Sequence, residues 1–122
     1  MWNLVKQGKY DLAIKSYQKA IAINPDHASA HNNLGLVYVK QGKLDEAIAE
    51  CKKALEINPN YLQAHYNIAC AYSLKKEKTL AIESLQKATT LDSRVIEASK
   101  TNSDFDNIRE SREFQQLINS IK

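Results

Sequence analysis

A spacing of 34 residues relates separate stretches of this chain and constrains its fold more than any other feature. The tetrapeptide KQGK at residues 6–9 returns unchanged at residues 40–43, and the Asn–Pro pair at residues 24–25 returns at residues 58–59. A fixed period of roughly 20–50 residues is typical of a repeat array, in which neighbouring units bury each other's apolar faces. The sequence therefore predicts a stack of similar units.

Residues 28–61 form the most complete of these units. Its first half carries small or apolar side chains at helical spacing: Ala30, Leu34, Val37 and Tyr38. Its second half carries a similar stripe: Leu44, Ala47, Ile48, Cys51, Ala54 and Leu55. Gly42 can end the first helix in the left-handed conformation, and Asn58–Pro59 ends the second. The unit is thus expected to be a hairpin of two helices.

These residues resemble the tetratricopeptide repeat, whose pattern is Trp-x2-Leu-Gly-x2-Tyr, then Ala-x3-Phe, then Ala and Pro. The unit at residues 28–61 matches it with His31, Leu34, Gly35, Tyr38, Ala47, Cys51, Ala54 and Pro59. The next unit matches it with His65, Ile68, Ala69, Tyr72, Ala81, Leu85 and Ala88. The departures are His for Trp in both units, Ser93 for Pro, and Lys76 where the turn Gly belongs. The resemblance covers roughly residues 1–95.

This resemblance implies an all-α fold, a superhelix of antiparallel helix hairpins. Residues 1–27 would form a partial repeat, residues 28–61 and 62–95 complete repeats, and residues 96–122 a helical cap. The cap prediction depends on a final amphipathic stripe behind the candidate N-cap Ser111: Phe114, Leu117, Ile118 and Ile121. The alternative is an amphipathic helix that binds a membrane or a partner. The charges of this stretch are mixed and not basic, which argues against a membrane.

The beginning of the chain supplies only the last two turns of a first helix, at residues 1–7. Either the sequence is a fragment of a longer array, or it starts naturally with an incomplete hairpin. In both cases Tyr17 and Ile21 are expected to be poorly covered, since the helix that would shield them is short. Self-assembly into a homo-oligomer through that face is therefore the alternative function.

The composition excludes several classes of protein. The chain is 43% hydrophobic and 25% charged, with a net charge of +3 that is spread along its length. Nucleic acids and anionic membranes both require a concentrated basic patch, so neither is an expected partner. No apolar run reaches the length of a spanning helix, and residues 1–5 lack the features of a signal peptide. Two cysteines at different repeat positions suggest reduced thiols and a cytoplasmic location.

Few side chains offer chemistry. His31 and His65 occupy the same repeat position and have no third ligand near in sequence, which favours a structural role over a metal site. Cys51 is expected in the core, and Cys70 is expected to be a partly exposed thiol with no basic neighbour to activate it. The chain has no phosphate loop and no nucleophile–base pattern. We therefore expect no catalytic residue, no cofactor and no metal.

The functional surface is instead expected on the concave side of the stack, which the first helix of each hairpin lines. The positions expected to be exposed there form the candidate peptide-binding site: Asn32, Asn33, Leu36, Lys40, Gln63, Tyr66, Asn67, Cys70 and Leu74. Asn33 and Asn67 lie one period apart and would form a short ladder of amides, which suits the backbone of an extended peptide. The alternative is that these amides are merely solvated. The interpretation is a non-catalytic module that binds a protein or peptide partner.

One subclass of the family is disfavoured by the residues present. Its cochaperone members bind chain-terminal carboxylates of chaperones through a clamp of Lys, Asn, Asn, Lys and Arg. The second Asn corresponds to Asn33, but Gln63 and Asn67 occupy the later Lys and Arg positions. Trp2 replaces the first Asn. Without these cations, paired carboxylates would find no matching charge.

Overall fold

A computed structural model describes residues 8–120 of the chain. These residues contain no strand and form the following helices in order: α2 (Tyr10–Ile23), α3 (Ala28–Gln41), α4 (Leu44–Ile57), α5 (Leu62–Leu74), α6 (Lys78–Leu91), α7 (Val95–Thr101), the 3-10 helix η1 (Ser103–Phe105) and α8 (Arg112–Asn119). The predicted all-α fold is confirmed. The expected helical turns at residues 1–7 and the apolar Ile121 lie outside the described residues.

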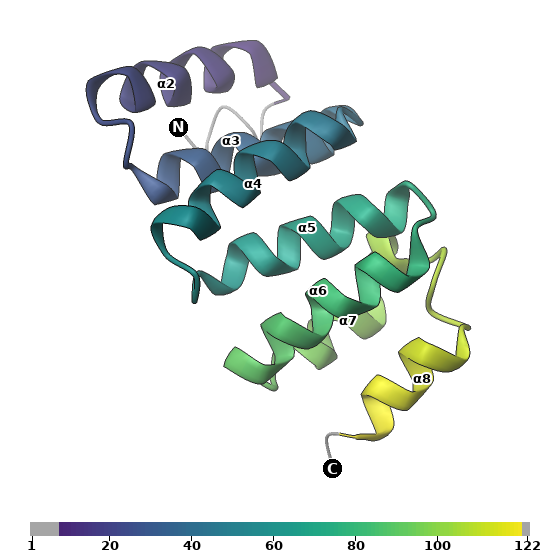
Figure 1. The fold of residues 1–122 in the computed structure, drawn as a ribbon. Helices are drawn as coiled ribbons and strands as arrows, with labels where there is room; N and C mark the ends of the chain where they lie inside the picture. The colour runs from purple at the N-terminus through teal and green to yellow at the C-terminus, as the bar shows by residue number, and fades with distance from the viewer. Residues whose placement is uncertain (1–7, 121–122) are drawn as a thin grey trace.

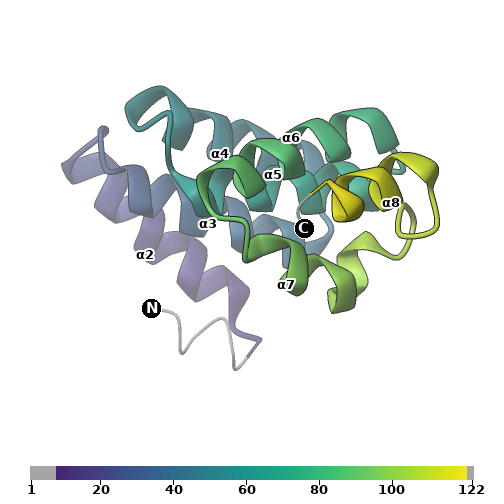
Figure 2. The same ribbon diagram turned by 90° about the horizontal axis from the view of Figure 1, so that it is seen from below.

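The helices stack as antiparallel hairpins (Figure 1). Helix α3 packs against α4, and α5 packs against α6. Helix α5 also contacts both α3 and α4, so it joins the two hairpins. Figure 2 shows α4 and α6 along one edge of the molecule and α7 along the opposite edge. The first helices of the hairpins, α3 and α5, therefore share a side of the stack with α7.

The turns within the two hairpins have the same backbone geometry. Gly42 has a φ of 78° and is followed by a hydrogen bond of 2.9 Å from Lys43 N to Tyr38 O. In the second hairpin Lys76 has a φ of 65°, and Glu77 N donates to Tyr72 O over the same distance. This is the left-handed ending of a helix that glycine adopts without steric cost. Lys76, which stands where the family pattern has Gly, adopts it despite its Cβ.

Small side chains let α3 and α4 approach closely. A Cβ added to Gly35 would lie 2.5 Å from Cys51 Sγ and 3.0 Å from the carbonyl oxygen of Ala47. Cys51 is fully buried, as the sequence predicts. Burial also raises the pKa of its thiol to about 12, so it stays protonated at neutral pH. Gly35 is thus required for packing and not for a turn.

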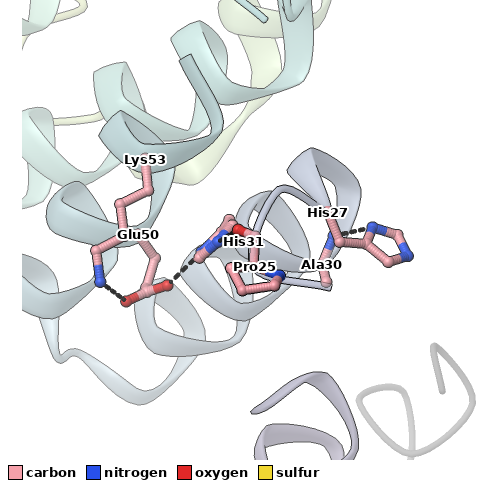
Figure 3. Close-up of polar contacts among 6 residues, drawn as sticks. All are labelled: Pro25, His27, Ala30, His31, Glu50 and Lys53. Carbon is pink, nitrogen blue, oxygen red and sulfur yellow. Dashed lines mark hydrogen bonds and ion pairs between the residues drawn. The ribbon is translucent and has the colours of Figure 1, made fainter. Parts of the chain in front are cut away.

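His31 connects three parts of the chain (Figure 3). Its Nε2 lies 2.9 Å from the carbonyl oxygen of Pro25, and its Nδ1 lies 2.9 Å from Glu50 Oε1 on α4. His65 repeats only the first contact, with Nε2 2.9 Å from the carbonyl oxygen of Pro59. A carbonyl oxygen can only accept a hydrogen bond, so Nε2 is the donor in both units. Both histidines hold the loop that precedes their own helix.

The C-terminal segment covers the second hairpin. Phe105, Ile108 and Phe114 are buried in one cluster with Leu85 of α6. The ring of Phe105 also meets that of Tyr66 edge-on, with centroids 5.5 Å apart. Ser111 caps α8 by accepting a hydrogen bond of 3.2 Å from Phe114 N. Phe114 thus packs on the second hairpin, and the predicted N-cap Ser111 is confirmed.

The expectation of an uncovered face at Tyr17 is wrong. Tyr17 is only 5% exposed and packs in a cluster with Leu34 and Val37 of α3. Ile21 is half-buried against the same cluster. The physical reason is that the apolar stripe of α2 faces α3, the next helix along the chain. The most exposed large apolar side chain of α2 is Ile23, which is 79% exposed.

Candidate functional site

A cavity of about 410 Å³ lies between α3, α5 and α7. Its lining comes from these three helices: Asn32, Asn33, Leu36, Leu62, Gln63, Tyr66, Asn67, Val95 and Ala98. Six of the nine residues predicted for the site are brought together here: Asn32, Asn33, Leu36, Gln63, Tyr66 and Asn67. We refer to this cavity as the groove.

Two of the groove amides bind each other. Asn67 Nδ2 donates to Asn32 Oδ1 over 3.0 Å and so joins α5 to α3. Both side chains are buried, with 4% of Asn32 and 6% of Asn67 exposed, so the expectation that they are exposed is wrong. The sequence predicted a ladder of Asn33 and Asn67, one period apart, that both face a ligand; in the structure the Asn67 amide is bound to Asn32. Packing of α3 on α5 causes this, because Asn32 faces the neighbouring helix.

Asn33 and Gln63 retain more capacity for a ligand. Asn33 is half-buried, and its amide is held by two long contacts of 3.5 Å, with Asn32 Nδ2 and with Ser29 Oγ. Contacts of this length are weak and can be exchanged at low cost. Gln63 is exposed at the beginning of α5. These two amides can therefore offer a donor and an acceptor to a backbone lying in the groove.

Tyr66 forms a fixed wall of the groove. Its Oη accepts a hydrogen bond of 2.9 Å from Asn102 Nδ2, and its ring contacts Phe105. Burial raises the pKa of Tyr66, while the hydrogen bond from Asn102 lowers it. Because the hydroxyl is already bound and the ring is packed, Tyr66 offers a ligand mainly apolar surface.

The other three predicted residues do not line the groove. Lys40 is exposed at the end of α3, and Leu74 is partly buried against Val39 and Ala71. Cys70 is only 3% exposed, so the expectation of a partly exposed thiol is wrong. The C-terminal segment causes this burial, and Asn102 Nδ2 lies 3.9 Å from Cys70 Sγ. Burial, reinforced by Asp104, raises the pKa of the Cys70 thiol, which argues against a nucleophile.

The groove lining is neutral. Its side chains are four amides, one phenol and the aliphatic groups of Leu36, Leu62, Val95 and Ala98. A carboxylate placed here would lose hydration without gaining a cation. Within residues 8–120, no group of three or more His, Cys, Asp and Glu side chains is positioned to hold a metal ion. None of the helices in this part of the chain has the length and apolarity needed to cross a membrane.

Sequence reasoning missed Leu62, Val95 and Ala98. A signal for the last two was present, because residues 96–98 look like the start of another first helix. First helices line the concave side, so this similarity predicts a place in the groove for α7. The interruption at residues 101–104 concealed it, since the 34-residue pattern ends there.

Three family models match the sequence. One described as a TPR repeat matches residues 3–42, and two described as tetratricopeptide repeats match residues 28–61 and 50–83. The chain belongs to the tetratricopeptide repeat family. A comparison with curated proteins finds no match.

Solved structures of this family share the fold. The first TPR domain of Spaghetti (RPAP3), bound to the HSP90 peptide SRMEEVD, has a TM-score of 0.74 at 22% identity. The match covers 97% of this chain and 84% of that structure's chain. The TPR2B domain of yeast Sti1, in complex with an Hsp70 peptide, has a TM-score of 0.72 at 29% identity, covering 98% and 87%. YrrB, described as having an unusual peptide-binding site, has a TM-score of 0.73 at 29% identity, covering 80% and 52%.

Proposed function

We propose that this chain is a non-catalytic interaction module that holds an extended segment of a partner protein in the groove. The observation that carries the proposal is that exchangeable amides and apolar side chains line one cavity of about 410 Å³. Such a lining can satisfy the backbone of a peptide and also bury its side chains. The cytoplasmic location expected from the sequence stays a prediction.

The similar structures support the binding of a peptide, and the residues of the groove indicate which kind of peptide it is. Two of the similar structures hold peptides of the chaperones HSP90 and Hsp70. In this chain the two later cationic positions of the chaperone clamp carry Gln63 and Asn67, which are neutral. We therefore propose a peptide partner that is not a chaperone tail ending in several carboxylates.

Most of the binding free energy is expected to come from apolar contacts. Each hydrogen bond from Asn33 or Gln63 to a bound backbone would contribute about 0.5–1.5 kcal/mol net. Micromolar binding requires roughly 8 kcal/mol. The remainder must come mostly from burial against side chains such as Leu36 and Tyr66, since no charged residue lines the groove.

The test begins with affinity capture of a partner and continues with the purified pair. We expect Asn33→Ala combined with Gln63→Ala to weaken binding about fivefold or more, because two backbone hydrogen bonds are lost. The matched control is Glu56→Ala combined with Gln86→Ala, which alters exposed residues of α4 and α6. Equal affinities for all three proteins, measured by calorimetry, would refute the groove as the binding site.

A further inference from the structure

Helix α7, which follows the second hairpin along the chain, supplies a wall of the groove. Val95 is half-buried and Ala98 is exposed, and both line the cavity. The same helix buries Ile96 in the cluster that holds Phe114. One side of α7 is thus anchored in the core while another faces the groove. We call Val95 and Ala98 the α7 wall.

The α7 wall is held at both ends. Before it, Arg94 binds Asp92 at the end of α6, with Arg94 Nη2 2.8 Å from Asp92 Oδ2 and Arg94 N 3.0 Å from Asp92 Oδ1. After it, Asn102 donates to Tyr66 Oη over 2.9 Å, and Arg109 Nη2 donates to the carbonyl oxygen of Asn102 over 2.6 Å. The Arg94–Asp92 contacts hold the turn that leads into α7, and the hydrogen bond from Asn102 to Tyr66 ties the end of α7 to α5. The groove is thus bounded by α7 without a ligand.

The two charged side chains of α7 are paired with each other. Glu97 and Lys100 of α7 form an exposed ion pair of 2.9 Å with each other, and neither lines the groove. The side chains that do line it are neutral. A carboxylate seated there would therefore be desolvated without a partner, whereas an apolar side chain would gain from burial.

We propose that the α7 wall makes the groove select an uncharged internal segment of a partner, with one apolar side chain seated against Leu36, Val95 and Ala98. Segments that bring a carboxylate to that position are rejected. This inference rests on the proposed function and adds the chemistry of the ligand and the residues that determine it. A groove of about 410 Å³ has room for such a side chain together with part of its backbone.

The probe is a phage-displayed library of random dodecapeptides, selected on the immobilised full chain. Enriched peptides are resynthesised with acetylated and amidated ends and titrated by fluorescence polarisation. We expect one apolar position whose replacement by Ala weakens binding about tenfold. Replacement by Asp at that position is expected to abolish binding. A peptide with several carboxylates and a free C-terminus is expected not to bind.

Variants of the chain identify the wall that this side chain contacts. Ala98→Leu fills part of the groove and is expected to weaken the selected peptide about tenfold. Ala98→Lys adds a cation and is expected to restore measurable binding of the Asp-substituted peptide. The matched controls are Ala49→Leu and Ala49→Lys, at an exposed position of α4, and neither should change either affinity. Circular dichroism melts establish that each variant is folded.

The outcomes separate this inference from the proposed function. If no peptide is enriched, or if the selected peptides ignore Asn33→Ala, Leu36→Ala and Ala98→Leu alike, the groove is not the site and both proposals fail. If they depend on Asn33 and Leu36 but tolerate Ala98→Leu, or accept Asp at every position, the groove remains the site and the α7-wall inference is overturned.

Discussion

The hairpins α3–α4 and α5–α6 have the same fold and turn geometry, yet different residues stabilise them. His31 of the first hairpin binds both the Pro25 carbonyl and Glu50, whereas His65 of the second binds only the Pro59 carbonyl. The first hairpin ends its leading helix with Gly42, and the second does so with Lys76. Residues at the same repeat position are therefore expected to contribute differently to the stability of their hairpins.

The two hairpins also differ in their neighbours. The first lies between α2 and α5, which belong to other repeats. The second is covered by the C-terminal segment, whose Phe105 and Phe114 pack with Leu85. A regular repeat can stabilise the middle of a stack, but its end requires a segment of different sequence. Here that segment also completes the groove with α7.

The largest expected effect concerns the cover of the second hairpin. Phe114→Ala should lower the free energy of unfolding by about 3–5 kcal/mol, because Phe114 is fully buried and its removal leaves a cavity. Urea unfolding followed by circular dichroism measures this loss. The control Ile23→Ala, at a side chain that is 79% exposed, should change stability by less than about 0.5 kcal/mol. A loss below about 0.5 kcal/mol for Phe114→Ala, no larger than that of the control, would show that the segment is only loosely attached.

The next prediction compares the two histidines. His31→Ala should cost about 2–3 kcal/mol, since it removes two contacts and leaves the partly buried Glu50 without one of its partners. His65→Ala should cost only about 0.5–1.5 kcal/mol, since a single, more exposed contact is lost. The measurement is again urea unfolding of both variants. Equal losses would mean that the contact between His31 and Glu50 adds nothing to the stability of the first hairpin.

Exchanging the two turn residues tests the backbone strain directly. Lys76→Gly should stabilise the protein by about 0.5–1 kcal/mol, because the strain of a positive φ exceeds the added entropy of glycine in the unfolded chain. Gly42→Lys should destabilise it by about 1–2 kcal/mol for the same reason. Thermal melts of both variants measure the two effects. A loss of stability in Lys76→Gly would contradict the strain argument.

The smallest predicted effect concerns the junction between α6 and the α7 wall. Hydrogen bonds from the side chain and backbone of Arg94 lower the pKa of Asp92 from 3.8 to about 2. Because the folded pKa is depressed, this contribution to stability is present above pH 3.8 and is lost as the pH falls through about 2. Arg94→Ala should raise the pKa of Asp92 toward 3.8 in an NMR titration. An unchanged pKa would show that the pair is not formed.

The sequence predicted features that follow from the pattern within one repeat. It did not predict the contacts and burial that depend on how one repeat packs against the next. The 34-residue period predicted the hairpins, and the stretch behind Ser111 predicted the final helix and its N-cap. Lys76 was expected only as a departure from the turn Gly, and its positive φ is a finding of the structure. The pairing of Asn32 with Asn67 depends on how α5 lies against α3, which no local pattern records. The burial of Cys70 depends on a segment outside the repeat, and that of Tyr17 on the direction of the α2 stripe.

The central claim is that the groove between α3, α5 and α7 is where a partner segment binds. The most direct test is to follow the backbone amide signals of the isotopically labelled chain by NMR during titration with a selected, end-blocked peptide. We predict that the largest shifts occur at Asn33, Leu36, Gln63 and Ala98. Shifts concentrated instead on the exposed faces of α4 and α6, for example at Glu56 and Gln86, would contradict the account.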